Sequence, residues 1–206
     1  MFNKFNSLRN SMLVAMPTPI QEEQDYFAEA VILICEHDEK GAMGLVINRP
    51  LDINVAEVLQ QMRIVNNNNS LRQIPVLSGG PVKSDKGFIL HFNELIPQSN
   101  KAQDINLMTE WRSSMILNEH LAITTSDDII HALANNTHPS PFIFALGYCE
   151  WSAGQLENEL KENSWLCAPF DLDILFNIPH LRRWRECTYN IGIDNIHNLS
   201  TYIGHA

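Results

Sequence analysis

Long apolar runs bounded by polar turns dominate the first quarter of the chain and predict buried β-strands. The run Ala30–Cys35 is apolar and largely β-branched, and Met43–Asn48 follows it after the polar residues 36–41. Two such runs joined by a short turn predict a β-hairpin. A shorter apolar run, Met12–Met16, predicts a strand that precedes the hairpin.

Apolar residues at helical spacing predict helices in other parts of the chain. Asn54 is followed three residues later by Glu57, which is the spacing of a capping box, and helical periodicity continues through Met62. Ser126 is placed to cap a second helix, because the apolar residues after it recur at helical intervals. A last helical segment is predicted over residues 179–187.

Glycines punctuate the strands predicted in the middle of the chain. The runs Ile74–Leu77 and Gly87–His91 flank the turn sequence Gly79-Gly80-Pro81. Further along, Pro141–Leu146 is apolar and aromatic enough for a buried strand, and the pattern stops at Gly147.

The segment after Gly147 carries the strongest indication of a site. Ser152 and Gln155 have the spacing of a capping box, so a helix is expected to begin there. A buried strand that gives way to a helix at a glycine typically borders a ligand site. The sequence therefore predicts that residues 148–155 form the wall of a crevice.

These elements are consistent with an α+β fold, because hairpins and separate helices do not alternate as βαβ units would. The sheet is expected to be mostly antiparallel. With 206 residues, 45% of them hydrophobic, the chain can bury a sizeable core and is expected to form one domain over residues 1–206. Residues 1–10 are expected to be flexible, and the asparagine-rich residues 66–70 to form a solvated loop.

Composition narrows the possible partners and the compartment. The formal net charge of −10 disfavours direct binding of nucleic acid. The densest basic cluster comprises Arg182, Arg183 and Arg185, and is either a solvated helix face or a small anion patch. The apolar run Met12–Met16 is too short for a signal peptide or a membrane span, so a cytoplasmic protein without membrane attachment is expected. Four scattered cysteines indicate buried thiols rather than disulfides or zinc.

Short motifs along nearly the whole chain resemble one family, the YqgE/AlgH proteins (UPF0301). The motifs are Val14-Ala15-Met16-Pro17, Glu36-His37, Gly41-Ala42-Met43-Gly44, Asn48-Arg49-Pro50, Gly79-Gly80-Pro81-Val82, Gly87-Phe88, Leu90-His91, Gly147-Tyr148, Trp151, Ala153-Gly154-Gln155-Leu156, Glu159, Trp165, Phe176, Trp184, Gly192 and Gly204-His205-Ala206. The resemblance implies a single α+β domain in which a bent, branched, mostly antiparallel sheet forms a partial barrel flanked by helices. It implies no activity, because this bacterial family is uncharacterised, although its AlgH member bears the name of a transcriptional regulator.

Glu36, His37 and His91 lie at predicted strand ends and are candidates for acid–base chemistry. A histidine beside a carboxylate can act as a general base or bind a metal ion. Alternatively, both histidines hydrogen-bond loop backbone and hold the turns. Cys149 is either a reactive thiol or inert packing, and the latter is more typical of a cysteine at the end of an apolar strand. Gly79-Gly80 either exposes backbone N–H groups to a ligand or forms a tight turn.

The best candidate for a ligand pocket combines polar side chains with two tryptophans. Trp151 and Trp165 either stack on a ligand or anchor the core through internally bonded indole N–H groups. The pocket residues predicted from the sequence are Glu36, His37, Asn48, Arg49, Gly79, Gly80, His91, Tyr148, Trp151, Gln155, Glu159 and Trp165. No catalytic set is assigned, and neither a metal nor another cofactor is expected.

Two classes of function follow from these patterns. The first is a non-enzymatic binding or regulatory protein that acts through an unknown protein or small-molecule partner. The alternative is a hydrolase or transferase that uses Glu36, His37 and His91, with Arg49 holding an anionic substrate. Direct regulation of DNA would need a basic face, which the charge balance does not predict.

Overall fold

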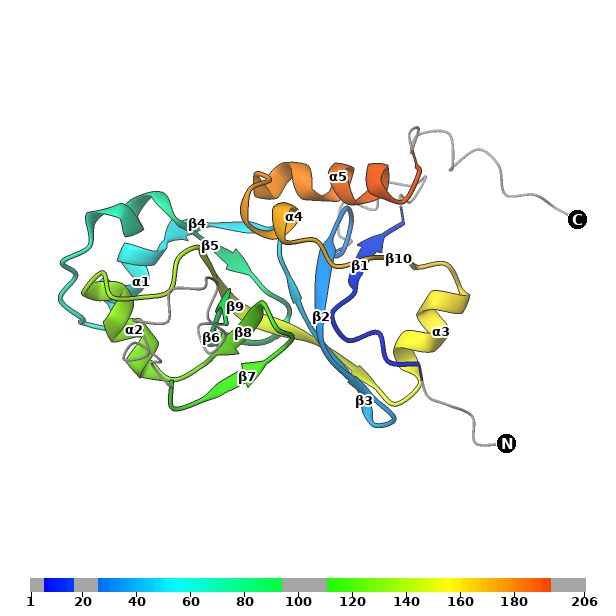
Figure 1. The fold of residues 1–206 in the computed structure, drawn as a ribbon, viewed down its shortest axis with the longest axis horizontal. Coiled ribbons are helices and arrows are strands. Elements are labelled where there is room, and N and C mark those ends of the chain that lie inside the picture. The colour runs from blue at the N-terminus through cyan, green and yellow to red at the C-terminus, as the bar shows by residue number, and fades with distance from the viewer. Residues whose placement is uncertain (1–5, 17–25, 94–110, 194–206) are drawn as a thin grey trace, which may run out of the picture. The chain divides into compact units, whose positions relative to one another are not determined.

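A computed structural model describes residues 6–16, 26–93 and 111–193 of the protein (Figure 1). The chain divides into two compact units: unit 1 runs up to Arg49 and resumes at Cys149, and unit 2 is Pro50–Tyr148. The single domain expected over residues 1–206 stays a prediction. The motif at residues 204–206 lies outside the described residues. Residues 1–5 of the segment predicted to be flexible lie outside them as well.

Unit 1 contains an antiparallel sheet in the order β10, β1, β2, β3 and the end of β9. Its strands are β1 (Met12–Ala15), β2 (Val31–Asp38), β3 (Gly41–Val46), β10 (Trp165–Ala168) and residues 149–152 of β9 (Phe142–Ser152). The predicted hairpin is confirmed as β2 and β3. The predicted first strand is confirmed as β1, which pairs with both β2 and β10.

Helices cover this sheet and complete unit 1. They are α3 (Gln155–Lys161), α4 (Leu172–Phe176), the 3₁₀ turn η3 (His180–Arg182) and α5 (Arg183–Asn190). The segment predicted over residues 179–187 is thus a 3₁₀ turn followed by a helix. Helix α5 packs on β1, β2 and β10 (Figure 1), where the Trp184 indole donates a hydrogen bond of 2.9 Å to the Ala15 carbonyl.

The position of Arg183 contradicts the interpretation of the whole basic cluster as a solvated helix face. Its side chain is buried, and its guanidinium donates hydrogen bonds to the carbonyls of Ile47 and Ile178. Burial lowers the pKa of Arg183 to about 10, so the group remains charged at neutral pH. Arg182 pairs with Glu186 one helical turn away. One arginine of the cluster is therefore a structural anchor and another belongs to a surface ion pair.

Unit 2 is built on a second set of strands. They are β4 (Pro50–Asn54), β5 (Pro75–Ser78), β6 (Val82–Phe92), β7 (Ser114–Ile116), β8 (Leu121–Thr124) and residues 142–148 of β9. The antiparallel order is β9, β6, β8 and β7, while β5 pairs in parallel with β9 and antiparallel with β4. The sheet branches where β9 pairs with both β5 and β6. The predicted α+β class with a bent, branched and mostly antiparallel sheet is confirmed.

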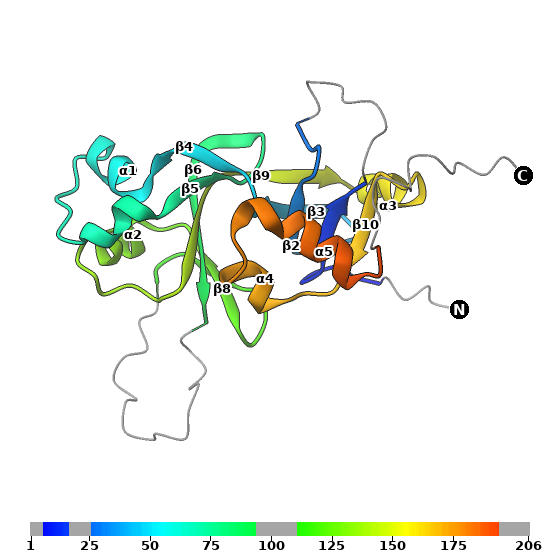
Figure 2. The same cartoon turned by 90° about the horizontal axis from the view of Figure 1, so that it is seen from above.

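Helices α1 (Val55–Gln61) and α2 (Asp127–Ala134) lie side by side in unit 2 (Figure 2). Their apolar faces share one core with Ile89 and Phe144 of the sheet. The predicted capping box is confirmed, because the Asn54 side chain accepts from the Glu57 backbone and the Glu57 carboxylate accepts from Asn54. Ser126 is the N-cap residue of α2, but its hydroxyl donates to the Asp128 carboxylate instead of accepting from the helix backbone.

The asparagine tract is partly built into the fold. Asn68 is buried, its amide donates to the Leu133 carbonyl, and its side-chain oxygen caps the 3₁₀ turn η1 (Asn69–Gln73). The prediction of a solvated loop is therefore wrong at Asn68, because an amide side chain can satisfy backbone groups in a buried turn.

Strand β9 does not stop at Gly147, as the sequence pattern predicted, but continues to Ser152. Gly147 has φ +74°, and the backbones of Gly79 and Gly80 pass directly against this part of β9. Gly154 takes the N-cap position of α3, while the Gln155 side chain accepts a hydrogen bond from the Ser152 backbone. Only half of the expected capping box forms, and residues 148–152 extend the sheet instead of ending it.

Candidate functional site

Glu159 of α3 gathers three of the other side chains predicted to line the pocket. Its Oε2 accepts hydrogen bonds of 2.8 Å from the indole N–H groups of both Trp151 and Trp165, and its Oε1 accepts one of 2.9 Å from the Gln155 amide. Both tryptophans are buried, and their rings meet edge to face with centroids 6.4 Å apart. The geometry matches the alternative in which internally bonded indoles anchor the core.

Asn48 and Arg49 serve the segment that leads into β2. The buried Asn48 side chain accepts from the Val31 N–H and donates to the Glu29 carbonyl, each at 2.8 Å. Arg49 donates to the Ala28 carbonyl at 2.6 Å. These contacts close a loop onto the end of β3, so the structure gives both side chains a backbone-binding role.

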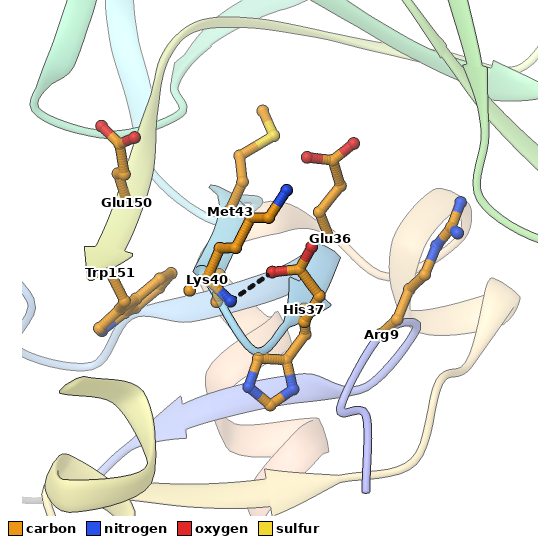
Figure 3. Close-up of a pocket in the computed structure, with 10 residues that line it drawn as sticks. Arg9, Glu36, His37, Lys40, Met43, Glu150 and Trp151 are labelled. Atoms are coloured by element: carbon orange, nitrogen blue, oxygen red, sulfur yellow. Dashed lines mark hydrogen bonds between the residues drawn. The ribbon is translucent and has the colours of Figure 1, made fainter. Parts of the chain in front are cut away.

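Glu36 and His37 lie on opposite faces of β2, because successive side chains of a strand alternate. Glu36 is exposed, whereas the His37 side chain is 1% exposed and its ring points away from Glu36 (Figure 3). His37 Nδ1 accepts a 2.8 Å hydrogen bond from the Leu8 N–H, and Nε2 pairs with Glu157 at 3.0 Å. Both ring nitrogens are therefore engaged, and the carboxylate beside His37 comes from α3.

An open pocket of about 410 Å³ lies on the exposed face of the β2–β3 hairpin in unit 1. The register places Glu36 opposite Met43 and Met43 opposite Glu150, so a thioether lies between two exposed carboxylates (Figure 3). Arg9 and Lys40 also line the pocket. We call the row Glu36, Met43 and Glu150 the acidic shelf.

The remaining predicted residues, Gly79, Gly80, His91 and Tyr148, belong to unit 2. The two glycines lie where the chain passes close to Gly147, so their backbones pack against β9. The Tyr148 ring packs edge to face on Phe88, with centroids 5.5 Å apart.

His91 is buried in a chain of polar contacts. Its Nδ1 lies 2.7 Å from the Phe92 carbonyl, which assigns the proton to this nitrogen. Its Nε2 lies 2.8 Å from the Thr124 hydroxyl, which in turn lies 2.6 Å from the Ser114 hydroxyl. Burial lowers the pKa of His91 below its ordinary value, so the neutral ring is stabilised.

The lowered pKa of His91 predicts that stability falls as the pH drops below about 6.5, the ordinary histidine value. There the unfolded chain binds a proton that the folded chain disfavours, so the free energy of unfolding decreases as the solution is acidified. Urea unfolding between about pH 7 and pH 5 should show a shallower decline for His91→Gln than for the wild type. The same substitution at exposed His131 is the control, and equal slopes for His91→Gln and the wild type would contradict the prediction.

Cys149 is 2% exposed, and burial raises its pKa to about 12. A thiol that is protonated and shielded is a poor nucleophile. Burial also raises the pKa of Cys35 and of Cys187. These features fit the interpretation of Cys149 as inert packing.

The sequence did not point to Glu157 as the partner of His37, nor to Met43 as the centre of the acidic shelf. Strand alternation was the available signal, because it separates Glu36 from His37 once the strand continues past Cys35. Glu157 carried no signal of its own, since it lies 120 residues from His37. Across the described ranges, no group of three or more metal-ligating side chains is placed to hold an ion, and no helix is long and apolar enough to cross a membrane.

Comparison with known proteins gives a consistent family assignment. The AlgH-like family model matches residues 12–196. UPF0301 proteins of Idiomarina loihiensis and Photobacterium profundum are 42% and 44% identical to the chain, covering 98% and 97% of it and all of each relative. The solution structure of AlgH from Pseudomonas aeruginosa is similar with a TM-score of 0.72 and 38% identity, covering 98% of this chain and 97% of that one. The names of these relatives state no activity.

Proposed function

We propose that this chain, which belongs to the AlgH-like family, is a non-enzymatic binding protein that recognises a partner protein. The observation that carries the proposal is that all four ring nitrogens of His37 and His91 already have partners within the protein. A general base must reach the proton that it abstracts, and these buried rings offer no free nitrogen to a substrate. The same contacts weigh against the alternative of a hydrolase or transferase that uses Glu36, His37 and His91.

The acidic shelf is the proposed contact surface. Glu36 and Glu150 are exposed, and Met43 between them is half-buried. Methionine adapts to varied partners, and carboxylates attract cations, so the shelf fits a basic side chain that follows an apolar one in a partner segment. An open pocket suits a protein surface better than it suits the enclosure of a small substrate.

The negative net charge also bears on how the protein would exert a regulatory role. With a net charge of −10, the protein is proposed to act in the cytoplasm through protein contacts, without direct binding of nucleic acid. A regulatory role would then be indirect, because the partner and not this protein would contact DNA.

The Glu150→Lys variant tests the proposed surface. We expect capture of the partner from the native cytosol to fall by roughly tenfold, because reversal of one charge replaces an attraction with a repulsion. Glu162→Lys makes the same charge change at an exposed position at the end of α3 and should capture as much partner as the wild type. Quantitative mass spectrometry of the captured proteins measures the ratio for each variant.

Two outcomes would overturn the proposal. Equal losses in both variants would mean that net charge, and not the acidic shelf, governs capture. Turnover of ester or phosphoester substrates by the wild type, abolished in both His37→Gln and His91→Gln, would establish an enzyme. Native mass spectrometry before and after denaturation complements the test, since a retained ligand would appear as mass that disappears on unfolding.

A further inference from the structure

A second pocket, about 410 Å³ in volume, lies within unit 2 between the sheet and the helices α1 and α2. Its floor is formed by two cross-strand pairs of β6 and β9, Gly87 with Leu146 and Ile89 with Phe144. Val58 and Ile130 of the helices supply apolar walls. The volume lies within the range of about 300 to 1,000 Å³ typical of small-molecule sites.

Gly87 lines this pocket without contributing a side chain. Its backbone does not adopt the left-handed region, and a Cβ built on it would meet only the Phe144 ring, at 3.5 Å. That distance is ordinary van der Waals contact, so the fold does not demand a glycine here. Glycine in a strand sacrifices packing and increases the entropy lost on folding. Its effect at position 87 is to leave this part of the pocket lining without a side chain.

The polar groups of the pocket lining determine which charge an occupant can carry. Lining residues with polar side chains are Gln61, Asp85, Thr124, Thr125, Ser126 and Asp127, and none of the lining residues is basic. Arg112 already pairs with Asp127 at 2.9 Å. Asp85 forms no ion pair in the part of the chain that the structure describes, so its carboxylate is the negative charge available to an occupant of the pocket.

We infer that this pocket binds a small amphiphilic amine, with its apolar body in the space beside Gly87 and its ammonium group at Asp85. Charge complementarity favours a cation over a neutral ligand, and the absence of a basic side chain disfavours a carboxylate or phosphate. The site lies apart from the acidic shelf in the sequence and in its lining residues, so the inference does not depend on the proposed function.

Binding can be tested with three probes that differ only in the head group: n-hexylamine, n-hexanol and hexanoate. We expect saturable NMR shifts at the methyl groups of Ile89 and Ile130 with n-hexylamine, with a dissociation constant on the order of 1 mM for so small a ligand. The alcohol should bind about fivefold more weakly, because an exposed ion pair strengthens binding by no more than about this factor. Hexanoate should cause no saturable shift.

Variants of the full chain separate the apolar and ionic parts of the site. Gly87→Leu should abolish binding of n-hexylamine, because the leucine side chain would occupy the space that glycine leaves in the pocket. Lys86→Leu places the same side chain one residue away on the opposite face of β6 and should bind n-hexylamine at least as tightly as the wild type, because it only removes a positive charge next to Asp85. Asp85→Asn should reduce the affinity for the amine to that for the alcohol.

The inference is overturned if hexanoate binds as tightly as the amine, or if Gly87→Leu retains binding while its NMR spectrum remains that of a folded protein. If Gly87→Leu fails to fold, Asp85→Asn decides: an unchanged affinity for n-hexylamine would reject the proposed ammonium site. No saturable shift with the amine would also reject the inference and would leave the pocket to an apolar side chain of a partner protein.

Discussion

Replacing Gly147 by alanine is expected to destabilise the protein by about 4 kcal/mol, through backbone strain and overpacking together. Gly147 has φ +74°, and a Cβ built on it would lie 2.3 Å from the Gly80 carbonyl oxygen and 3.1 Å from that of Val82. The obstructing atoms belong to backbone, which cannot rotate away as a flexible side chain can. Urea unfolding followed by circular dichroism measures the loss.

Gly154→Ala is the matched control for Gly147→Ala. Gly154 has the same φ of +74°, but a Cβ there would meet nothing within 4 Å. The Gly154→Ala variant should therefore lose only the stability that an alanine in the left-handed conformation costs, about 1 kcal/mol. If the two variants lose equal stability, the close approach of Gly80 to β9 contributes nothing and the prediction fails.

Replacing Glu159 by alanine is expected to cost about 3 kcal/mol, because two buried indole donors lose their acceptor. Both Trp151 and Trp165 donate to the same oxygen of Glu159, and Gln155 donates to the other. Denaturant unfolding gives the loss of stability. Near-UV circular dichroism should report altered packing of the two indoles.

Glu159→Gln tests whether the acceptor, and not the charge, matters most. Glutamine keeps one oxygen that both indoles can share and loses only the acceptor of the exposed Gln155 amide, which can turn to water, so the variant should lose only about 1 kcal/mol. Equal losses of stability in Glu159→Ala and Glu159→Gln would contradict this prediction. They would show that the negative charge of Glu159, and not its number of accepted hydrogen bonds, determines its contribution to stability.

Features encoded by neighbouring residues were predictable from the sequence. The β2–β3 hairpin follows from two apolar runs around a polar turn, and α1 follows from the capping box of Asn54 and Glu57. The α+β class follows from the order of these elements. Each signal lies within a window of a few residues, where pattern and propensity act together.

Features that depend on distant residues were not predictable. Gly147 was interpreted as the end of a strand, because the sequence does not reveal that another glycine segment packs against it. Arg183 was placed on the surface, since its carbonyl partner Ile47 lies 136 residues away. A cationic residue looks solvated in a sequence unless the backbone groups that it binds are known.

The residues predicted to line the candidate pocket also include some that meet in the structure and some that do not. Trp151, Gln155, Glu159 and Trp165 do meet, because they lie close together on β9, α3 and β10. Glu36 and His37 are adjacent in sequence but face opposite ways, so adjacency in a strand separated the proposed pair. Whether the twelve predicted residues include a ligand site stays a prediction.

The shared acceptor at Glu159 makes three positions interdependent in evolution. Substitution of Glu159 first would leave two indole N–H donors without an acceptor at once. Substitution of one tryptophan by phenylalanine first would remove only one donor, and the carboxylate would keep its hydrogen bond to the other indole. Substitution should therefore proceed in a preferred order, with the tryptophans changing before the acid. Glu159 looks the easiest of the three to replace, because it is a half-buried glutamate on a short helix. It should nevertheless be the last of the three to be substituted.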